Sequence, residues 1–149
     1  GFVADSATTI PIGDIDEETS ALLKVTEESL YKAIEQARVG NYVRDISQVV
    51  QEWVEKHGFS VVRELVGHGV GREMHEDPQI PNYVTAQRGP KLKEGLVIAI
   101  EPMVNVGGCE VRLKRDRWTI ETLDRSRSAH FEHTVAVTKD GPQILTAGR

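Results

Sequence analysis

The sequence Gly67-His68-Gly69-Val70-Gly71, followed shortly by His75-Glu76-Asp77-Pro78, is the most informative stretch of this chain. Its glycines exclude an ordinary helix and allow close approach of neighbouring backbone. Two later apolar runs each reach one glutamate, Ile98-Ala99-Ile100-Glu101-Pro102 and Ala129-His130-Phe131-Glu132-His133-Thr134. A carboxylate that closes a core strand is costly unless its charge is compensated. One imidazole and several carboxylates converging from separate strands would suit a divalent metal ion, so we expect a metal-dependent enzyme.

Composition narrows the class of protein. Hydrophobic residues make up 39% and charged residues 28% of the 149 residues, which indicates one globular domain over residues 1–149. The net charge of −5 disfavours a nucleic-acid partner, and no apolar run approaches the roughly 20 residues of a membrane helix. The single Cys109 permits no internal disulfide and favours a reducing compartment, so we expect a cytoplasmic protein with no membrane partner. Because the chain begins at Gly1 within an expected strand, we expect the natural N-terminus to lie elsewhere.

Apolar spacing predicts two helices followed by strands. The first helix is expected over residues 21–39, after an acidic approach and before Gly40. The second ends before Gly58 and carries one apolar stripe, formed by Ile46, Val49, Val50, Trp53 and Val54. Strands are expected over residues 1–12, 61–66, 96–101, 110–113, 118–122, 131–138 and 143–146, with hairpin turns at Arg115-Asp116 and Lys139-Asp140-Gly141. This order predicts an α+β fold with two helices packed on an antiparallel sheet.

Three better-known motifs fit this sequence poorly. The glycines lack the spacing of a nucleotide-binding fingerprint and Pro78 interrupts any helix after them, so phosphate binding is excluded. His75-Glu76 lacks the second histidine of a zinc-protease helix, because position 79 is Gln. His130 and His133 could bind zinc as a pair, but a strand would point them to opposite faces. We therefore expect that pair to be unrelated to metal.

Strand alternation gives both glutamates small neighbours. Ala99 shares the face of Glu101, and Thr134 shares the face of Glu132, which leaves space for an ion. Either glutamate alone is more commonly a surface carboxylate at a strand end, and a single His68 is more often structural. Their joint occurrence beside the glycines favours the metal site.

Several short sequence motifs of this chain occur in the same order as in one known protein family. They are Gly1-Phe2-Val3-Ala4-Asp5-Ser6-Ala7, Phe59-Ser60-Val61-Val62, Gly67 to Gly71, His75 to Pro78, Ile100-Glu101-Pro102-Met103, Trp118-Thr119 and Ser128-Ala129-His130-Phe131-Glu132-His133-Thr134. Over almost its whole length the chain resembles the C-terminal portion of the type I methionine aminopeptidases, which have the pita-bread fold. The proline-specific aminopeptidases share that fold, but Trp118-Thr119 and the run over residues 128–134 favour the methionine branch.

The resemblance implies a site for two adjacent divalent ions with five protein ligands. Four ligands match residues of this chain, namely Asp5, His68, Glu101 and Glu132. The fifth, an aspartate upstream of Asp5, would precede Gly1 together with the first half of the fold, so we expect a peptidase domain truncated at its N-terminus. Carboxylates with one imidazole suit Co, Mn, Fe or Zn. Three carboxylates leave two such ions incompletely neutralised, so this chain should bind one ion well and the second poorly.

The implied reaction removes N-terminal methionine from methionyl peptides and nascent chains. Glu101 would transfer the proton as well as bind metal, and His75 would bind substrate and stabilise the oxyanion. Met74 and Trp118 would contact the methionine side chain, although Trp118 could instead pack in the core. The truncated chain is expected to be weak or inactive alone, with the missing half of the fold as its partner. Alternatives are a non-catalytic or metal-binding pita-bread module and a related X-Pro aminopeptidase.

Overall fold

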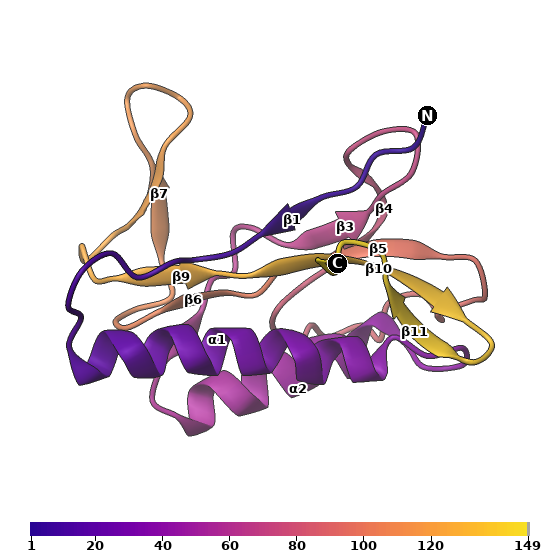
Figure 1. The fold of residues 1–149 in the computed structure, drawn as a ribbon, viewed down its shortest axis with the longest axis horizontal. Coiled ribbons are helices and arrows are strands. Elements are labelled where there is room, and N and C mark those ends of the chain that lie inside the picture. The colour runs from indigo at the N-terminus through magenta and orange to yellow at the C-terminus, as the bar shows by residue number, and fades with distance from the viewer. Residues whose placement is uncertain (149) are drawn as a thin grey trace.

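The computed structural model describes residues 1–148, and its two helices lie beneath a layer of strands (Figure 1). Helix α1 spans Glu17–Gln36, and its buried side chains recur every three or four residues, as in Leu22, Val25, Ser29 and Ala33. The carboxylate of Asp16 caps the helix by accepting the backbone N–H of Thr19 at 2.7 Å. This cap explains why α1 begins four residues before the predicted start.

Helix α2 spans Val43–Lys56 and confirms the second predicted helix. Ile46, Val50 and Val54 from its apolar stripe are fully buried against the core. The chain leaves the helix through Gly58, whose φ of 81° is readily adopted only by glycine. Helix α1 ends earlier than predicted, at Gln36 instead of residue 39. Gly40 lies in the connection between α1 and α2.

The main sheet is antiparallel and has the strand order β1-β10-β5-β3-β4, with β11 added beside β10. The bounds are β1 Ser6–Ala7, β3 Gly67–Gly69, β4 Glu76–Ile80, β5 Val97–Ile100, β10 Glu132–Thr138 and β11 Gly141–Ile144. Ile98 and Ile100 of β5 and Val135 and Val137 of β10 join the core cluster with the helices. Alternation then sends Ala99 and Thr134 to the opposite face.

The remaining strands form a second sheet and a hairpin. The second sheet has the order β2-β6-β9, with β2 Ser60–Val61, β6 Met103–Asn105 and β9 Ser128–His130. Strands β7 Val111–Leu113 and β8 Ile120–Thr122 form the hairpin, whose tip stands away from the other elements in Figure 1. The chain passes between the two sheets at Glu101-Pro102 and again at Phe131, so both crossings lie beside the candidate glutamates.

The α+β class, the antiparallel sheet and both predicted hairpin turns are confirmed. Several strand predictions were wrong in extent. The first strand is limited to Ser6–Ala7, the strand predicted over 61–66 is limited to Ser60–Val61, and the one predicted over 131–138 begins only after the break at Phe131. Strands β3, β4, β6 and β9 were not predicted. In β4 the reason is Pro78, which a sheet accepts at its edge, where this strand lies.

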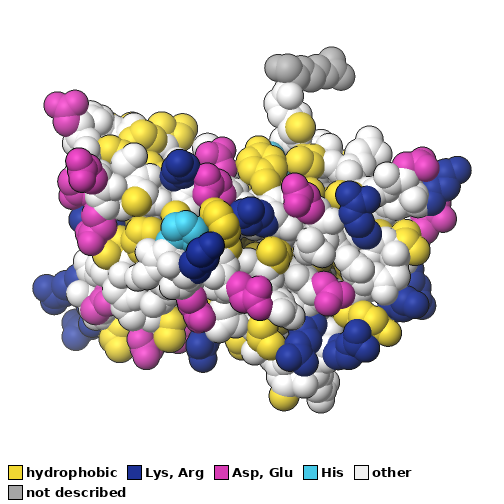
Figure 2. Space-filling view, turned by 90° about the horizontal axis from the view of Figure 1, so that it is seen from below, with side chains coloured by type: hydrophobic (Ala, Val, Ile, Leu, Met, Phe, Trp, Pro, Cys, Tyr) yellow, Lys and Arg dark blue, Asp and Glu magenta, His cyan; other side chains and the backbone are white. Residues whose placement is uncertain are grey.

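No described helix is long and apolar enough to cross a membrane. Figure 2 views the molecule from the side of the helices, where Lys and Arg side chains are interspersed with Asp and Glu. That face therefore carries mixed charge rather than a patch of one sign.

Candidate metal centre

The pairing of three strands places candidate ligands on one face of the main sheet. His68 of β3 lies opposite Ala99 of β5, and Ala99 lies opposite Thr134 of β10. Asp5, just before β1, is joined to Thr134 by two hydrogen bonds: its N–H donates to the Thr134 hydroxyl at 2.8 Å, and that hydroxyl donates to the Asp5 carbonyl at 2.7 Å. A row of residues from four adjacent segments therefore crosses this face.

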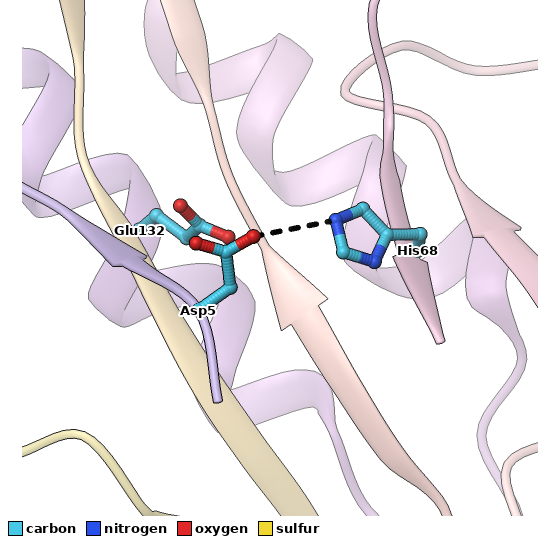
Figure 3. Close-up of side chains that lie close together, drawn as sticks. All are labelled: Asp5, His68 and Glu132. Carbon is cyan, nitrogen blue, oxygen red and sulfur yellow. Dashed lines mark ion pairs between the residues drawn. The ribbon is translucent and has the colours of Figure 1, made fainter. Parts of the chain in front are cut away.

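The two glutamates extend the same face by one further step along their strands. Glu101 lies two residues beyond Ala99, and Glu132 lies two residues before Thr134 in the antiparallel partner. The small Ala99 leaves the space between His68 and the carboxylates clear of a large side chain. Figure 3 shows the carboxylates of Asp5 and Glu132 directed toward the His68 imidazole, with the helices behind the strands.

The glycines on either side of His68 allow its strand to fit between two neighbours. A Cβ at Gly67 would lie 2.4 Å from the carbonyl oxygen of Ala99, and one at Gly69 would lie 2.2 Å from the carbonyl oxygen of Asp77. Side chains at either position would force β3 away from β4 or β5. The unusual composition of this stretch is therefore explained by close packing of the strands on either side of His68.

The orientation of His68 is set by its backbone. Its Nδ1 lies 2.9 Å from the carbonyl oxygen of Gly69, and a carbonyl can only accept, so this nitrogen carries the proton and donates. In the neutral ring Nε2 then presents a lone pair to the carboxylates. It lies 3.4 Å from Oε1 of Glu101 and 3.9 Å from Oδ2 of Asp5. This is the arrangement that a metal-binding imidazole requires.

Glu132 is the most deeply placed of the acidic groups. Glu132 is 4% exposed, and its Oε1 has no hydrogen-bond partner among the described residues. Burial, followed by the negative charges of Glu101 and Asp5, raises the pKa of Glu132 to about 7. An unpartnered buried carboxylate beside two others calls for a cation, and a divalent ion would satisfy all three.

The structure brings together the four residues predicted as metal ligands. One group of potential ligand atoms comprises Asp5, His68 and Glu132, and a second comprises Glu101, His130 and Glu132, with all atoms of each group within 4.8 Å of one another. Glu132 belongs to both groups. The donor set of carboxylates and imidazoles fits Mn, Fe, Co or Zn.

The residues predicted to bind substrate surround this cluster less closely. The ring of His75 packs beside that of His68, with their centroids 4.3 Å apart, so it lies at the edge of the candidate site. Met74 is about half exposed. Trp118 is 87% exposed in the turn of the β7–β8 hairpin, which excludes the alternative that it packs in the core.

The structure also places His130 beside the candidate site. The expectation that His130 and His133 point apart is correct, because His133 lies against Tyr31 and Thr146 while His130 lies 3.5 Å from Oε2 of Glu101. His130 also contributes to one group of potential ligand atoms, together with Glu101 and Glu132. No local pattern places it there, because the chain breaks at Phe131 and His130 and Glu132 belong to different sheets.

Comparison with known proteins agrees with this geometry. A methionine aminopeptidase of Clostridium acetobutylicum is 53% identical over 146 residues, which cover 98% of this chain and 58% of that protein. The crystal structure of a Thermotoga maritima methionine aminopeptidase superposes with a TM-score of 0.96 at 50% identity, covering 99% of this chain and 59% of the other. A Pyrococcus furiosus prolidase gives a TM-score of 0.75 at 26% identity, covering 99% and 38%.

The chain thus spans somewhat more than half the length of the methionine aminopeptidases it matches. The resemblance seen in the sequence motifs is confirmed, and so is the pita-bread architecture shared by these neighbours. The model of metallopeptidase family M24 matches residues 1–139, which include every candidate ligand. With its fold, its cluster of ligands and its relatives in agreement, this chain belongs to metallopeptidase family M24.

Proposed function

We propose that this chain carries most of the metal-binding side of a metalloaminopeptidase that removes N-terminal methionine from peptides and nascent proteins. The observation that carries the proposal is the convergence of Asp5, His68, Glu101 and Glu132 on one face of the sheet, from four separate segments. The high identity to methionine aminopeptidases supports this substrate class over the proline-specific enzymes, whose likeness is much lower.

The four residues would hold divalent ions, of which Mn, Co, Fe and Zn all suit the donor set. When bound, such ions supply Lewis acidity, which polarises a substrate carbonyl and lowers the pKa of water. Glu101 would take up a proton on a carboxylate oxygen during attack and return it to the leaving amine. Its carbonyl accepts a hydrogen bond from Asn82 at 3.0 Å, which fixes the end of β5 from which the side chain projects.

His75 would act on the substrate rather than on metal. It borders a pocket with His68, Glu76 and Gln79 and forms part of neither ligand group. From there its imidazole would donate a hydrogen bond to the carbonyl oxygen as negative charge develops on it. Met74 and Trp118 are the proposed contacts for the methionine side chain, and their exposure leaves both able to meet a substrate.

The test uses a polypeptide that extends this chain with its natural upstream sequence to the length of its relatives. With Mn²⁺ present it should release methionine from a peptide with a small second residue, and leave an X-Pro peptide uncut. Glu101→Gln should abolish release, whereas the matched control Glu94→Gln, at an exposed position before β5, should not. Metal binding without methionine release would favour a non-catalytic binding module, and cleavage of the X-Pro peptide would favour the proline-specific branch.

A further inference from the structure

A loop of five residues, 71–75, joins β3 to β4 and carries both Met74 and His75. The last four of these residues are exposed, and the loop contains no helix or strand. The ring of His75 nevertheless has a defined place, with its centroid 4.3 Å from that of His68. A hydrogen-bond donor to a reacting carbonyl must be held in position, so the conformation of this loop matters for the reaction.

The side chain of Glu76, the first residue of β4, turns back over this loop. Its Oε1 accepts the backbone N–H of Glu73 at 2.9 Å. The spacing of three residues is the one by which a glutamate reaches back to a backbone N–H in a capping box. The carbonyl oxygen of Glu73 in turn accepts the N–H of Gly71 at 3.1 Å. Both backbone groups of Glu73 are therefore engaged, one by Glu76 and one by Gly71.

Gly71 leaves the space in which this carboxylate lies. A Cβ at Gly71 would lie 2.8 Å from Oε1 and 2.9 Å from Oε2 of Glu76, and the three atoms nearest to it all belong to that carboxylate. Gly71 is not one of the glycines with a positive φ, so its backbone conformation is open to other residues. The structure therefore calls for glycine here because of the Glu76 side chain, and not because of the backbone.

The position of Glu76 suits this contact rather than metal binding. Glu76 belongs to neither group of potential metal ligands among the described residues, although it lines the same pocket as His75. A carboxylate accepts a backbone N–H more strongly than a neutral group does. Such a hydrogen bond shifts an equilibrium by roughly tenfold or more. Because Glu76 is exposed and water competes for the same atoms, the lower end of that range applies.

We propose that Glu76 is a positioning residue, which holds residues 71–75 in the conformation that presents His75 to the substrate. The inference rests on the proposed function, because it concerns the placement of the group that stabilises the oxyanion. Glu76 itself touches no reacting atom and acts only through the Glu73 N–H. Gly71 and Glu76 form one unit, since a side chain at the first position displaces the carboxylate of the second.

Amide hydrogen exchange followed by NMR tests the contact on the unsubstituted chain. Glu76→Ala should speed exchange of the Glu73 N–H about tenfold, and Gly71→Ala should do the same. Glu76→Gln keeps an acceptor oxygen and should retain most of the protection. In the Glu76→Ala background, Gly71→Ala should have no further effect. Glu73→Gln is the matched control, because it removes a charge from the same loop and keeps the N–H.

Turnover of a methionyl peptide by the extended polypeptide, with Mn²⁺ present, tests the consequence. Glu76→Ala should lower kcat about tenfold, and Glu76→Gln should restore most of it. The control Glu73→Gln should leave kcat unchanged, and calorimetric Zn²⁺ affinity should be the same in all variants. In a His75→Ala background, Glu76→Ala should cause no further loss, because residues that act as a unit are not additive.

Three results would overturn the assignment. Unchanged exchange at Glu73 in Glu76→Ala would show that the contact does not hold the loop. An equal loss of kcat with and without His75 would show that Glu76 does not act through that residue. Activity of Glu76→Gln as low as that of Glu76→Ala would mean that the charge matters and the hydrogen bond does not. If the unsubstituted extended polypeptide releases no methionine, the proposed function is refuted, and the exchange rates alone decide whether Glu76 fixes the loop.

Discussion

The substitution Glu132→Gln tests the electrostatics of the site without substrate. In the metal-free chain this carboxyl is buried beside two other carboxyls, and burial is the main cause that raises its pKa to about 7. Glutamine keeps the shape of the side chain but cannot ionise. We therefore expect the variant to be more stable than the unsubstituted chain at alkaline pH, although the replaced residue is a proposed metal ligand.

The magnitude follows from the pKa in the two states. A rise from 4.5 in the unfolded chain to about 7 in the fold corresponds to about 3 kcal/mol. Because the folded-state pKa is raised, the fold holds the proton more tightly than the unfolded chain does. The stability that the protonated Glu132 gives to the unsubstituted fold is therefore fully present below about pH 4.5. It is lost as pH rises through about 7. The advantage of Glu132→Gln should grow from near zero at pH 4.5 to about 3 kcal/mol at pH 8.

Urea denaturation between pH 4.5 and 8.5, with a chelator present, measures the free energy of unfolding of both proteins. Subtracting the two curves removes the contributions of all other titrating groups that behave alike. The exposed Glu94→Gln is the matched control and should give a difference near zero throughout. A Glu132→Gln difference that is independent of pH would refute the assigned burial and repulsion, as would a variant that is less stable at pH 8.

Three further substitutions separate the other roles. Gly67→Ala would place a Cβ 2.4 Å from the Ala99 carbonyl oxygen. We therefore expect the free energy of unfolding, measured by urea denaturation, to fall by about 1–3 kcal/mol. An unchanged free energy of unfolding would contradict the close packing. In the extended polypeptide, His75→Ala should lower turnover by about 10²–10³ while calorimetric Zn²⁺ affinity stays unchanged, since it removes an oxyanion donor and no ligand. The 87% exposed Trp118 should tolerate Ala within about 0.5 kcal/mol, yet the KM for a methionyl peptide should rise; strong destabilisation would instead reveal a structural role.

Much of the fold could be predicted from local patterns. Helix α2 was identified because its apolar stripe and the stop at Gly58 agree. Helix α1 was placed less accurately, since its first turn is acidic and polar and is defined by the Asp16 cap rather than by apolar spacing. Strand β4 has too little apolar character to be recognised, because it lies at the edge of the sheet and includes Pro78.

The site was predicted to different degrees for different residues. Glu101 and Glu132 stood out because a charged residue closing an apolar run needs an explanation. Asp5 gave no such signal and was found only through the family resemblance, since its position depends on Thr134, 129 residues away. His130 carries no comparable local signal, because its position beside Glu101 follows from the pairing of β9 with β6. Long-range strand pairing supplied what local patterns could not.

The same repulsion that weakens the metal-free fold favours binding of the metal. Three carboxyl groups and two imidazoles are held together by strand pairing, so the chain cannot relieve their repulsion by moving one of them away. Near neutral pH the metal-free site can be relieved only by protonating Glu132 or by admitting a cation. An ion that binds only the folded state then stabilises it in proportion to RT ln(1 + [L]/Kd). The repulsion among these candidate ligands and an affinity for divalent metal are therefore two expected consequences of one arrangement held by strand pairing.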